Sequence, residues 1–259
     1  MLKRIILFGI FSLISYLIKA QGEINDQTIL QLGDEKSYAF SLYSNGWGLD
    51  YRFGKRLDFF KKTNYEIIFS AIKNPKEQKQ TSINPYTFKK FVYGKQNYAF
   101  ALRFGYGFQK EIFSKYDKGG ISIKYFYSVG PSVGFYKPVY YVLSSYQVST
   151  FDTVLIHMAQ DIFDRKSFFY KFYETRVIPG AFGKFGFQFE YSKNDKFING
   201  LECGIMLEAF TKKIPIMSYD YNNKQFFFVL FVNYRIGNIT DPYLKKRRSE
   251  IKKYLEETL

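Results

Sequence analysis

The single histidine of the chain, His157, lies in a long stretch of residues 144–181 that also carries hydroxyl and carboxylate side chains. A hydroxyl, an imidazole and a carboxylate form an activated nucleophile when a fold brings them within hydrogen-bond reach. The candidates nearby in sequence are Ser149, Ser167, Asp152, Asp161 and Asp164. Their spacing is not diagnostic, because no G-x-S-x-G elbow is present, and VLIHMAQDIF reads better as a short amphipathic helix capping the fold. We therefore predict no enzyme, and keep a lipid hydrolase or acyltransferase with His157 as its catalytic candidate as an alternative.

The sequence contains few residues that could hold a metal ion or a cofactor. Cys203 is the one cysteine, so no intramolecular disulfide and no zinc site of the Cys/His kind can be assembled. G-Y-G-F at 105–108 has no following helix and is not a nucleotide-binding loop. We predict no metal and no cofactor, and interpret Cys203 as a small apolar residue on a strand.

Charged residues recur on one parity of segments whose other parity is apolar and aromatic. Phe185, Phe187 and Phe189, for example, alternate with Lys184, Gln188 and Glu190. Successive side chains of a strand point to opposite faces, so this period of two separates two environments. Across the segments, the charged parity holds Asp50, Arg52, Glu66, Arg103, Lys124, Lys184, Glu190, Glu202, Glu208 and Arg235.

Eight segments show this alternation, and aromatic side chains recur at their ends. They are residues 37–44, 47–54, 65–73, 97–108, 121–135, 182–191, 201–209 and 225–236. Strands of about ten residues with apolar outward rows and terminal aromatic girdles are typical of a transmembrane β-barrel. The sequence therefore predicts an all-β fold, an eight-stranded antiparallel transmembrane β-barrel, in which the apolar parity faces lipid.

The connections alternate in length, as outer-membrane barrels require. Short turns are expected near 56–63, 114–120 and 193–198, and long loops at about 74–91, 144–181 and 213–223. Asn45-Gly46 is a hairpin signal and gives a tight first outer turn, which returns both termini to the periplasm. The alternative is one bulged strand over residues 37–54, which leaves an odd strand count.

The charged parity then lines the lumen, with five acids and five bases. An eight-stranded barrel is just wide enough for side chains to fill, and buried charges are tolerated only when paired. We favour an ion-pair network that plugs the lumen over a selective pore. Small residues on the same parity would make room for the long side chains: Ala99, Ala101, Gly130, Gly134, Gly200 and Gly204.

A soluble periplasmic carrier with a lipocalin-like barrel is a third class of function. It would place apolar residues inside and charges outside, which inverts the assignment above. The balance of acids and bases on the charged parity, together with its glycines and alanines, favours a packed interior over a surface in bulk water.

The N-terminal residues have the form of a secretory signal, with Lys3 and Arg4 before an apolar run and Ala20 at the expected cleavage site. We expect residues 1–20 to be a signal peptide, 21–36 an N-terminal segment, 37–237 the barrel and 238–259 a tail. Loss of Lys3, Arg4 and Lys19 lowers the net charge from +15 to +12. We expect this positive charge to bind outer-membrane lipids with anionic headgroups. We do not expect it to bind nucleic acid.

The tail is predicted to be a short periplasmic helix, since Asp241-Pro242 is a helix start and apolar residues follow at helical spacing. Basic residues flank the apolar stripe of this helix. They favour binding to anionic lipid headgroups or to a periplasmic protein partner. The third alternative is a solvated, partly frayed helix. The flanking basic residues are Lys245, Lys246, Arg247, Arg248, Lys252 and Lys253.

Several stretches taken together resemble small outer-membrane β-barrel proteins of Bacteroidota. They are NGWGLDYRFGKR (45–56), NPKE (74–77), VYGKQN (92–97), GYGFQK (105–110), KPVYY (137–141), PGAFGKFGFQFEY (179–191) and KKIPIM (212–217). The resemblance implies an exported outer-membrane barrel and brings no catalytic motif. We thus expect a non-enzymatic membrane scaffold, or an accessory in envelope assembly or export, with an outer-membrane or periplasmic protein as a possible partner.

Overall fold

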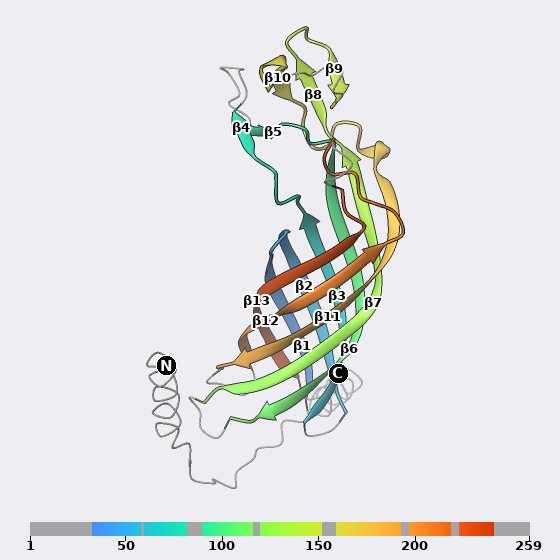
Figure 1. Cartoon of the computed structure of the whole chain (residues 1–259). Helices are drawn as coiled ribbons and strands as arrows, with labels where there is room; N and C mark the ends of the chain where they lie inside the picture. Colours follow the sequence, from blue (N-terminus) through green and yellow to red (C-terminus); the bar gives the residue numbers. More distant parts are fainter. Residues whose placement is uncertain are drawn as a thin grey trace, which may run out of the picture. The chain divides into compact units, whose positions relative to one another are not determined.

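The computed structural model describes residues 33–57, 60–81, 90–115, 120–151, 159–192, 197–218 and 223–240. Eight strands close one antiparallel barrel in the order β1-β13-β12-β11-β7-β6-β3-β2 (Figure 1), which confirms the predicted strand number and fold class. The barrel strands are β1 (Asp34–Tyr43), β2 (Gly46–Arg56), β3 (Lys61–Ile72), β6 (Asn97–Phe113), β7 (Ser122–Pro138), β11 (Arg176–Glu190), β12 (Phe197–Phe210) and β13 (Phe226–Thr240). No helix in the described ranges is long and apolar enough to cross a membrane.

The first hairpin is a true turn between two strands, since β1 and β2 pair from Tyr43 opposite Gly46 onwards. The two turn residues are Ser44 and Asn45, one position before the predicted Asn45-Gly46. Gly46 instead begins β2, where a Cβ atom would lie 1.9 Å from the carbonyl oxygen of Ala71 on β3. Its lack of a side chain therefore serves the close approach of two strands.

The barrel is slightly longer at both ends of the chain than predicted. β1 begins at Asp34 and β13 ends at Thr240, and these two residues are paired where the sheet closes. The predicted limits of 37 and 237 missed these positions because their side chains alternate less clearly. The predicted signal peptide and the predicted helix over 241–259 lie outside the described residues.

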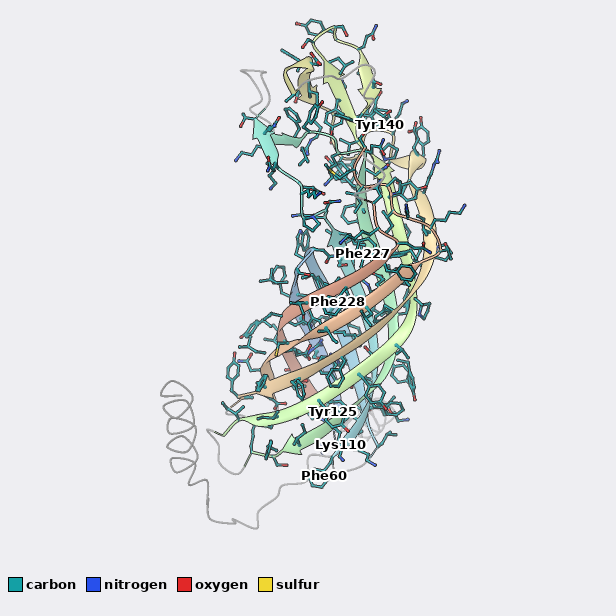
Figure 2. The ribbon with its side chains drawn as sticks, in the orientation of Figure 1. Phe60, Lys110, Tyr125, Tyr140, Phe227 and Phe228 are labelled. Carbon is teal, nitrogen blue, oxygen red and sulfur yellow. The ribbon has the colours of Figure 1, made fainter. Side chains whose placement is uncertain are left out.

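The two faces of the barrel wall differ as the alternation predicted. Phe227 and Phe228 are neighbours on β13 (Figure 2), yet Phe227 is 9% exposed and Phe228 63% exposed. Rings meet on the outer face near both ends of the wall. Tyr65 packs on Tyr106 towards one end, and Trp47 packs on Phe40 towards the other. Paired rings at both ends are the arrangement of aromatic girdles.

The connections define a short-turn end and a long-loop end. The short-turn end carries the connections 57–60, 114–121 and 191–196, and the long-loop end carries the turn at 44–45 and the connections 73–96, 139–175 and 211–225. The predicted alternation of lengths is confirmed. Within the long connections, β4 (Lys79–Thr81) pairs with β5 (Lys90–Val92), and β8 (Tyr140–Leu143) lies between β9 (Val148–Thr150) and β10 (Ile162–Arg165).

One predicted element in the long connection is wrong over the residues that the structure describes. VLIHMAQDIF was expected to be a helix, but its described part is a short 3-10 helix, η1 (Ala159–Asp161), followed by strand β10. Ile162 pairs with Leu143 of β8 and is fully buried, so pairing with a neighbouring strand overrides the helical pattern. A second 3-10 helix, η2 (Phe172–Glu174), precedes β11.

Candidate functional site: the lumen of the barrel

Six charged side chains form a closed ring inside the barrel, in which acids and bases alternate. We call it the charge ring, and its members are Asp50, Arg52, Glu66, Lys184, Glu202 and Arg235. Arg52 lies 2.6 Å from both Glu66 and Glu202. Arg235 lies 2.6 Å from Glu202 and 2.9 Å from Asp50. Lys184 closes the ring, at 2.9 Å from Asp50 and 3.5 Å from Glu66.

The charge ring crosses the lumen from wall to wall. Asp50 and Arg52 come from β2, which is four strands away from β11, the strand of Lys184, in either direction around the barrel. Every side chain of the ring is at most 3% exposed. Buried ionic groups at such distances hold one another in fixed positions, so the ring joins opposite walls of the barrel.

Neutral polar side chains occupy hydrogen-bonding positions around the charge ring. Asn233 donates to Glu202 at 3.0 Å, and Ser128 donates to Glu66 at 3.1 Å. Arg235 donates to the hydroxyl of Ser37 at 3.0 Å. These bonds use lone pairs and donors that the ion pairs leave over, which is what makes a buried polar network tolerable.

The other predicted lumen residues also point inwards and form two further groups. Towards the long-loop end, Arg103 donates two bonds to the carboxylate of Glu208, at 2.7 and 2.6 Å, and a third to Ser70. Towards the short-turn end, Glu190 accepts from Lys124 at 2.5 Å and from Lys115 at 2.9 Å. The structure thus brings all ten predicted residues into the interior, in three groups.

Sequence reasoning missed one buried pair, Glu35 with Lys62, which donates to it near the short-turn end. Both residues are 5% exposed. The alternation contained the signal, because Glu35 shares the parity of Ser37, and Lys62 that of Glu66. The predicted strands began after these positions, so Glu35 fell into the predicted N-terminal segment 21–36 and Lys62 into the predicted turn 56–63.

Apart from the Arg103–Glu208 pair, the half of the lumen towards the long-loop end is apolar, which corrects the expectation of a lumen filled by ion pairs alone. We call it the apolar layer. Its buried side chains include Ile68, Phe182, Met206, Phe210, Phe227, Val229 and Phe231, and Phe126 of the same cluster lies at the charge ring, 4.6 Å from the Arg52 guanidinium. A Cβ atom on Gly134 would lie 2.8 Å from the ring of Phe210. A Cβ atom on Gly204 would lie 2.1 Å from the carbonyl oxygen of Phe185 on β11 and 2.8 Å from the ring of Phe231. Gly134 therefore makes room for a ring and Gly204 mainly for the neighbouring strand, whereas both were predicted to accommodate long charged side chains.

The connection between β12 and β13 covers the apolar layer. Ile214, Ile216 and Met217 from this connection are buried within the same cluster. The carbonyl of Ile216 accepts a bond from the backbone amide of Gln96 at 2.9 Å. Asn223 accepts from the amides of Ile216 and Met217 and donates to the carbonyl of Met217. We call residues 214–218 the cap segment.

The other candidates from the sequence are not assembled into a site by the described residues. His157, Asp152 and the basic residues of the tail lie outside them. Ser149 is in β9, Asp161 in η1 and Asp164 in β10. Among the residues that the structure describes, no group of three or more His, Cys, Asp or Glu side chains is placed to hold a metal ion.

Comparison with known proteins gives matches in structure alone. No protein-family model and no curated protein matches this sequence. Neisserial surface protein A matches 80% of this chain and 96% of its own, with 9% identity and a TM-score of 0.38. The attachment invasion locus protein of Yersinia pestis matches 80% and 97%, with 8% identity and a TM-score of 0.36. The N-terminal β-barrel domain of Pseudomonas aeruginosa OprF matches 79% and 98%, with 7% identity and a TM-score of 0.34.

The distribution of side chains determines which medium surrounds the barrel. Large apolar side chains such as Tyr38 (61% exposed) and Val232 (52% exposed) cover the outside, and the paired charges are inside. This arrangement is the reverse of a lipocalin-like carrier, which encloses an apolar cavity. Closed sheets of this kind cross membranes because every strand has a hydrogen-bonded neighbour. The protein is a transmembrane β-barrel.

Proposed function

We propose that this protein is a non-enzymatic outer-membrane scaffold, or an accessory in envelope assembly or export, whose barrel does not conduct. The observation that carries the proposal is the charge ring, which joins opposite walls of the lumen. An ion path through the barrel would have to break several of its buried contacts. Separating a buried pair by removing one partner typically costs about 3–5 kcal/mol, so open states of the wild-type lumen are rare.

The charge balance of the interior supports the same conclusion. Selective pores present rings of one sign of charge to the passing ion. In the charge ring three acids alternate with three bases. Such an arrangement offers no continuous field to either cations or anions, and the apolar layer beyond it adds a dry barrier.

The scaffold function places the activity of the protein outside its lumen. Asp34 and Thr240 are paired at the short-turn end, so the chain segments before and after the barrel leave from the same end. The tail residues 241–259 are predicted from the sequence to bind headgroups or a protein partner there. The sheet of β8, β9 and β10 provides a second surface at the opposite end.

Conductance tests the first half of this proposal. We expect the full-length protein, inserted into planar bilayers in folded form, to give no current steps, whereas a general porin in the same bilayers conducts. Folding is checked on the same sample by the gel shift on boiling in dodecyl sulfate. Stable steps of uniform size from wild-type protein would contradict a closed lumen.

Truncation of the tail tests the proposed accessory role. Removal of residues 241–259 leaves the barrel strands intact, so the truncated protein should still shift on boiling and still not conduct. We expect it to lose crosslinks to periplasmic or outer-membrane proteins that the full-length protein forms in cells. Unchanged crosslinks after truncation would contradict an accessory role through the tail.

A further inference from the structure

A cavity of about 240 Å³ lies at the long-loop end, at the ends of β2, β3 and β6, where it reaches both the outer face and the inward-facing residues Ile72 and Ala99. Its wall includes Trp47, Ala71 and Phe100, which are direct partners across these three strands. All three belong to the lipid-facing parity. The cavity is thus continuous with the surface that the barrel presents to lipid, at the level of the aromatic girdle.

The remaining wall of the cavity combines apolar and aromatic side chains, among them Val92, Val139 and Tyr141, with a strongly basic group of charged side chains. The charged side chains come from the 73–96 connection, including β4 and β5, and from Arg165 of β10. The cavity is lined by one acidic side chain, Glu77, and by five basic ones: Lys73, Lys79, Lys90, Lys95 and Arg165. Lys95 forms an ion pair with Glu77 at 2.7 Å, which leaves the other four cations of the lining in excess.

Two of these cations are withdrawn from solvent, because Lys95 is buried and Arg165 is half-buried. Lys95 is 8% exposed, and burial lowers its pKa against the opposing effect of Glu77. The Nε atom of Arg165 is buried and has no hydrogen-bond partner among the described residues. Both side chains lie near the ring of Tyr98, at 5.2 Å for the Lys95 ammonium and 5.9 Å for the Arg165 guanidinium. An unsatisfied buried donor such as the Nε–H of Arg165 is costly, and an anion would satisfy it.

We propose that this cavity binds the phosphate-bearing headgroup of a glycolipid in the outer leaflet. The basic side chains take the phosphate, since Lys and Arg are its usual partners. The acyl chains lie along the girdle surface of Trp47, Phe69 and Phe100, where Phe69 and Phe100 stack at 5.8 Å. At about 240 Å³, the cavity is below the size of a typical drug-sized site, as expected if it encloses the headgroup alone.

The wall of the barrel favours a lipid over a soluble anion as the occupant. The β1–β2 hairpin ends in a turn of two residues at 44–45, so no loop from this hairpin stands between Trp47 and the membrane. Trp47 is 41% exposed and stacks on Phe40 of the lipid-facing surface. A soluble anion would use the basic wall and leave the aromatic wall without a function.

Trp47 is the single tryptophan of the chain, so its fluorescence reports on this cavity directly. The full-length protein is placed in phosphatidylcholine nanodiscs and titrated with a bisphosphorylated acyl-disaccharide lipid whose acyl chains carry bromine. We expect saturable quenching of Trp47, and little quenching by the same brominated lipid after removal of its phosphates.

Charge-neutralising variants locate the binding. Lys79→Gln/Lys90→Gln removes two exposed cations from the cavity wall, and Lys212→Gln/Lys213→Gln removes two exposed cations of the same loop end that do not line it. At about 1 kcal/mol per basic residue near a charged headgroup, we expect roughly tenfold or greater weakening for the first variant. The control variant should change the affinity less than twofold.

Three results would overturn the proposal. Equal quenching by the dephosphorylated lipid would remove the phosphate from the recognition. Equal weakening by the two variants would reduce binding to the general positive charge of the loops. Tight binding of the soluble bisphosphorylated disaccharide without acyl chains, in competition with the lipid and with the same affinity, would make the occupant a soluble anion. Saturable, phosphate-dependent quenching that only the cavity variant weakens supports a glycolipid site.

Discussion

The two halves of the lumen are closed by different physical means. Towards the short-turn end, charged side chains from opposite walls bind one another in the charge ring, and Lys124 pairs with Glu190 between the neighbouring strands β7 and β11. Towards the long-loop end, rings and aliphatic side chains fill the space and the cap segment covers them. The Arg103–Glu208 pair lies between, with the Arg103 guanidinium 5.9 Å from the ring of Tyr43.

The difference shows how a narrow barrel avoids both a pore and a strained interior. In the ionic half, stability depends on complete pairing, because each charge is costly once its partner is removed. In the apolar half it depends on shape, because a smaller side chain leaves a cavity. Single substitutions should therefore have different consequences in the two halves, and the following predictions rank them.

The largest effect is expected for Glu202→Gln in the charge ring. Glu202 accepts bonds from Arg52, Arg235 and Asn233, and its neutralisation leaves two buried guanidiniums short of a partner, a loss of about 3–5 kcal/mol. Urea unfolding of the refolded barrel, followed by the gel shift on boiling, measures the change. Asp34→Asn at the strand end is the matched control, and an equally small effect of both substitutions would refute a stabilising ring.

The apolar half should respond to loss of volume. Phe231→Ala removes a ring that packs on Phe126 and Tyr43, and we expect a loss of about 3 kcal/mol. Phe228→Ala on the lipid side of the same strand is the control, since Phe228 is 63% exposed and its removal leaves no internal cavity. The same unfolding experiment applies, and a larger loss for Phe228→Ala would reverse the assignment of the two faces.

A smaller, local effect is expected at the cap segment. Asn223→Ala removes three hydrogen bonds to Ile216 and Met217 and exposes the apolar layer, at a cost of about 1–3 kcal/mol. Hydrogen exchange of the amides of residues 214–218 should accelerate, whereas exchange in β12 should not. Lys224→Ala, at the exposed neighbouring residue, is the control and should leave exchange in the cap segment and in β12 unchanged. Equal exchange of the cap segment in the wild type and both variants would contradict its anchoring by Asn223.

The smallest effect is expected for an exposed ionic contact at the long-loop end. The Tyr140 hydroxyl, followed by Lys171, lowers the pKa of Glu174. A carboxyl with a lowered folded-state pKa stabilises the fold above its unfolded pKa, and this contribution is lost as pH falls through the folded value. A carbon NMR titration of Glu174 should give a midpoint below the usual Glu range, which Tyr140→Phe moves back up. An ordinary midpoint in the wild type would contradict this contact.

The alternation of the sequence was sufficient to predict the strands and the direction of the ten charged side chains. It was not sufficient to pair them, because which side chains meet across a lumen depends on the tilt and register of strands far apart in sequence. Arg52 and Glu202, for example, are separated by 150 positions. Strand ends were also missed where both parities are polar, as in residues 34–37.

The apolar layer had a signal that the prediction did not use. Residues 226–232, FFFVLFV, are apolar on both parities, which indicates that the inner face of β13 is apolar as well as the outer one. The cap segment and the glycolipid cavity could not be predicted in the same way, since they depend on how the connections 211–225 and 73–96 fold back on the rim.

The inside–outside assignment of the barrel is tested most directly at Cys203, the single cysteine, which is exposed on the outer face of β12. A nitroxide attached there in nanodiscs should collide frequently with oxygen, which concentrates in lipid, and rarely with a water-soluble nickel chelate. That result places the apolar face in the membrane and the charge ring in the lumen. Frequent collision with the chelate and rare collision with oxygen would place Cys203 in water and contradict the transmembrane barrel.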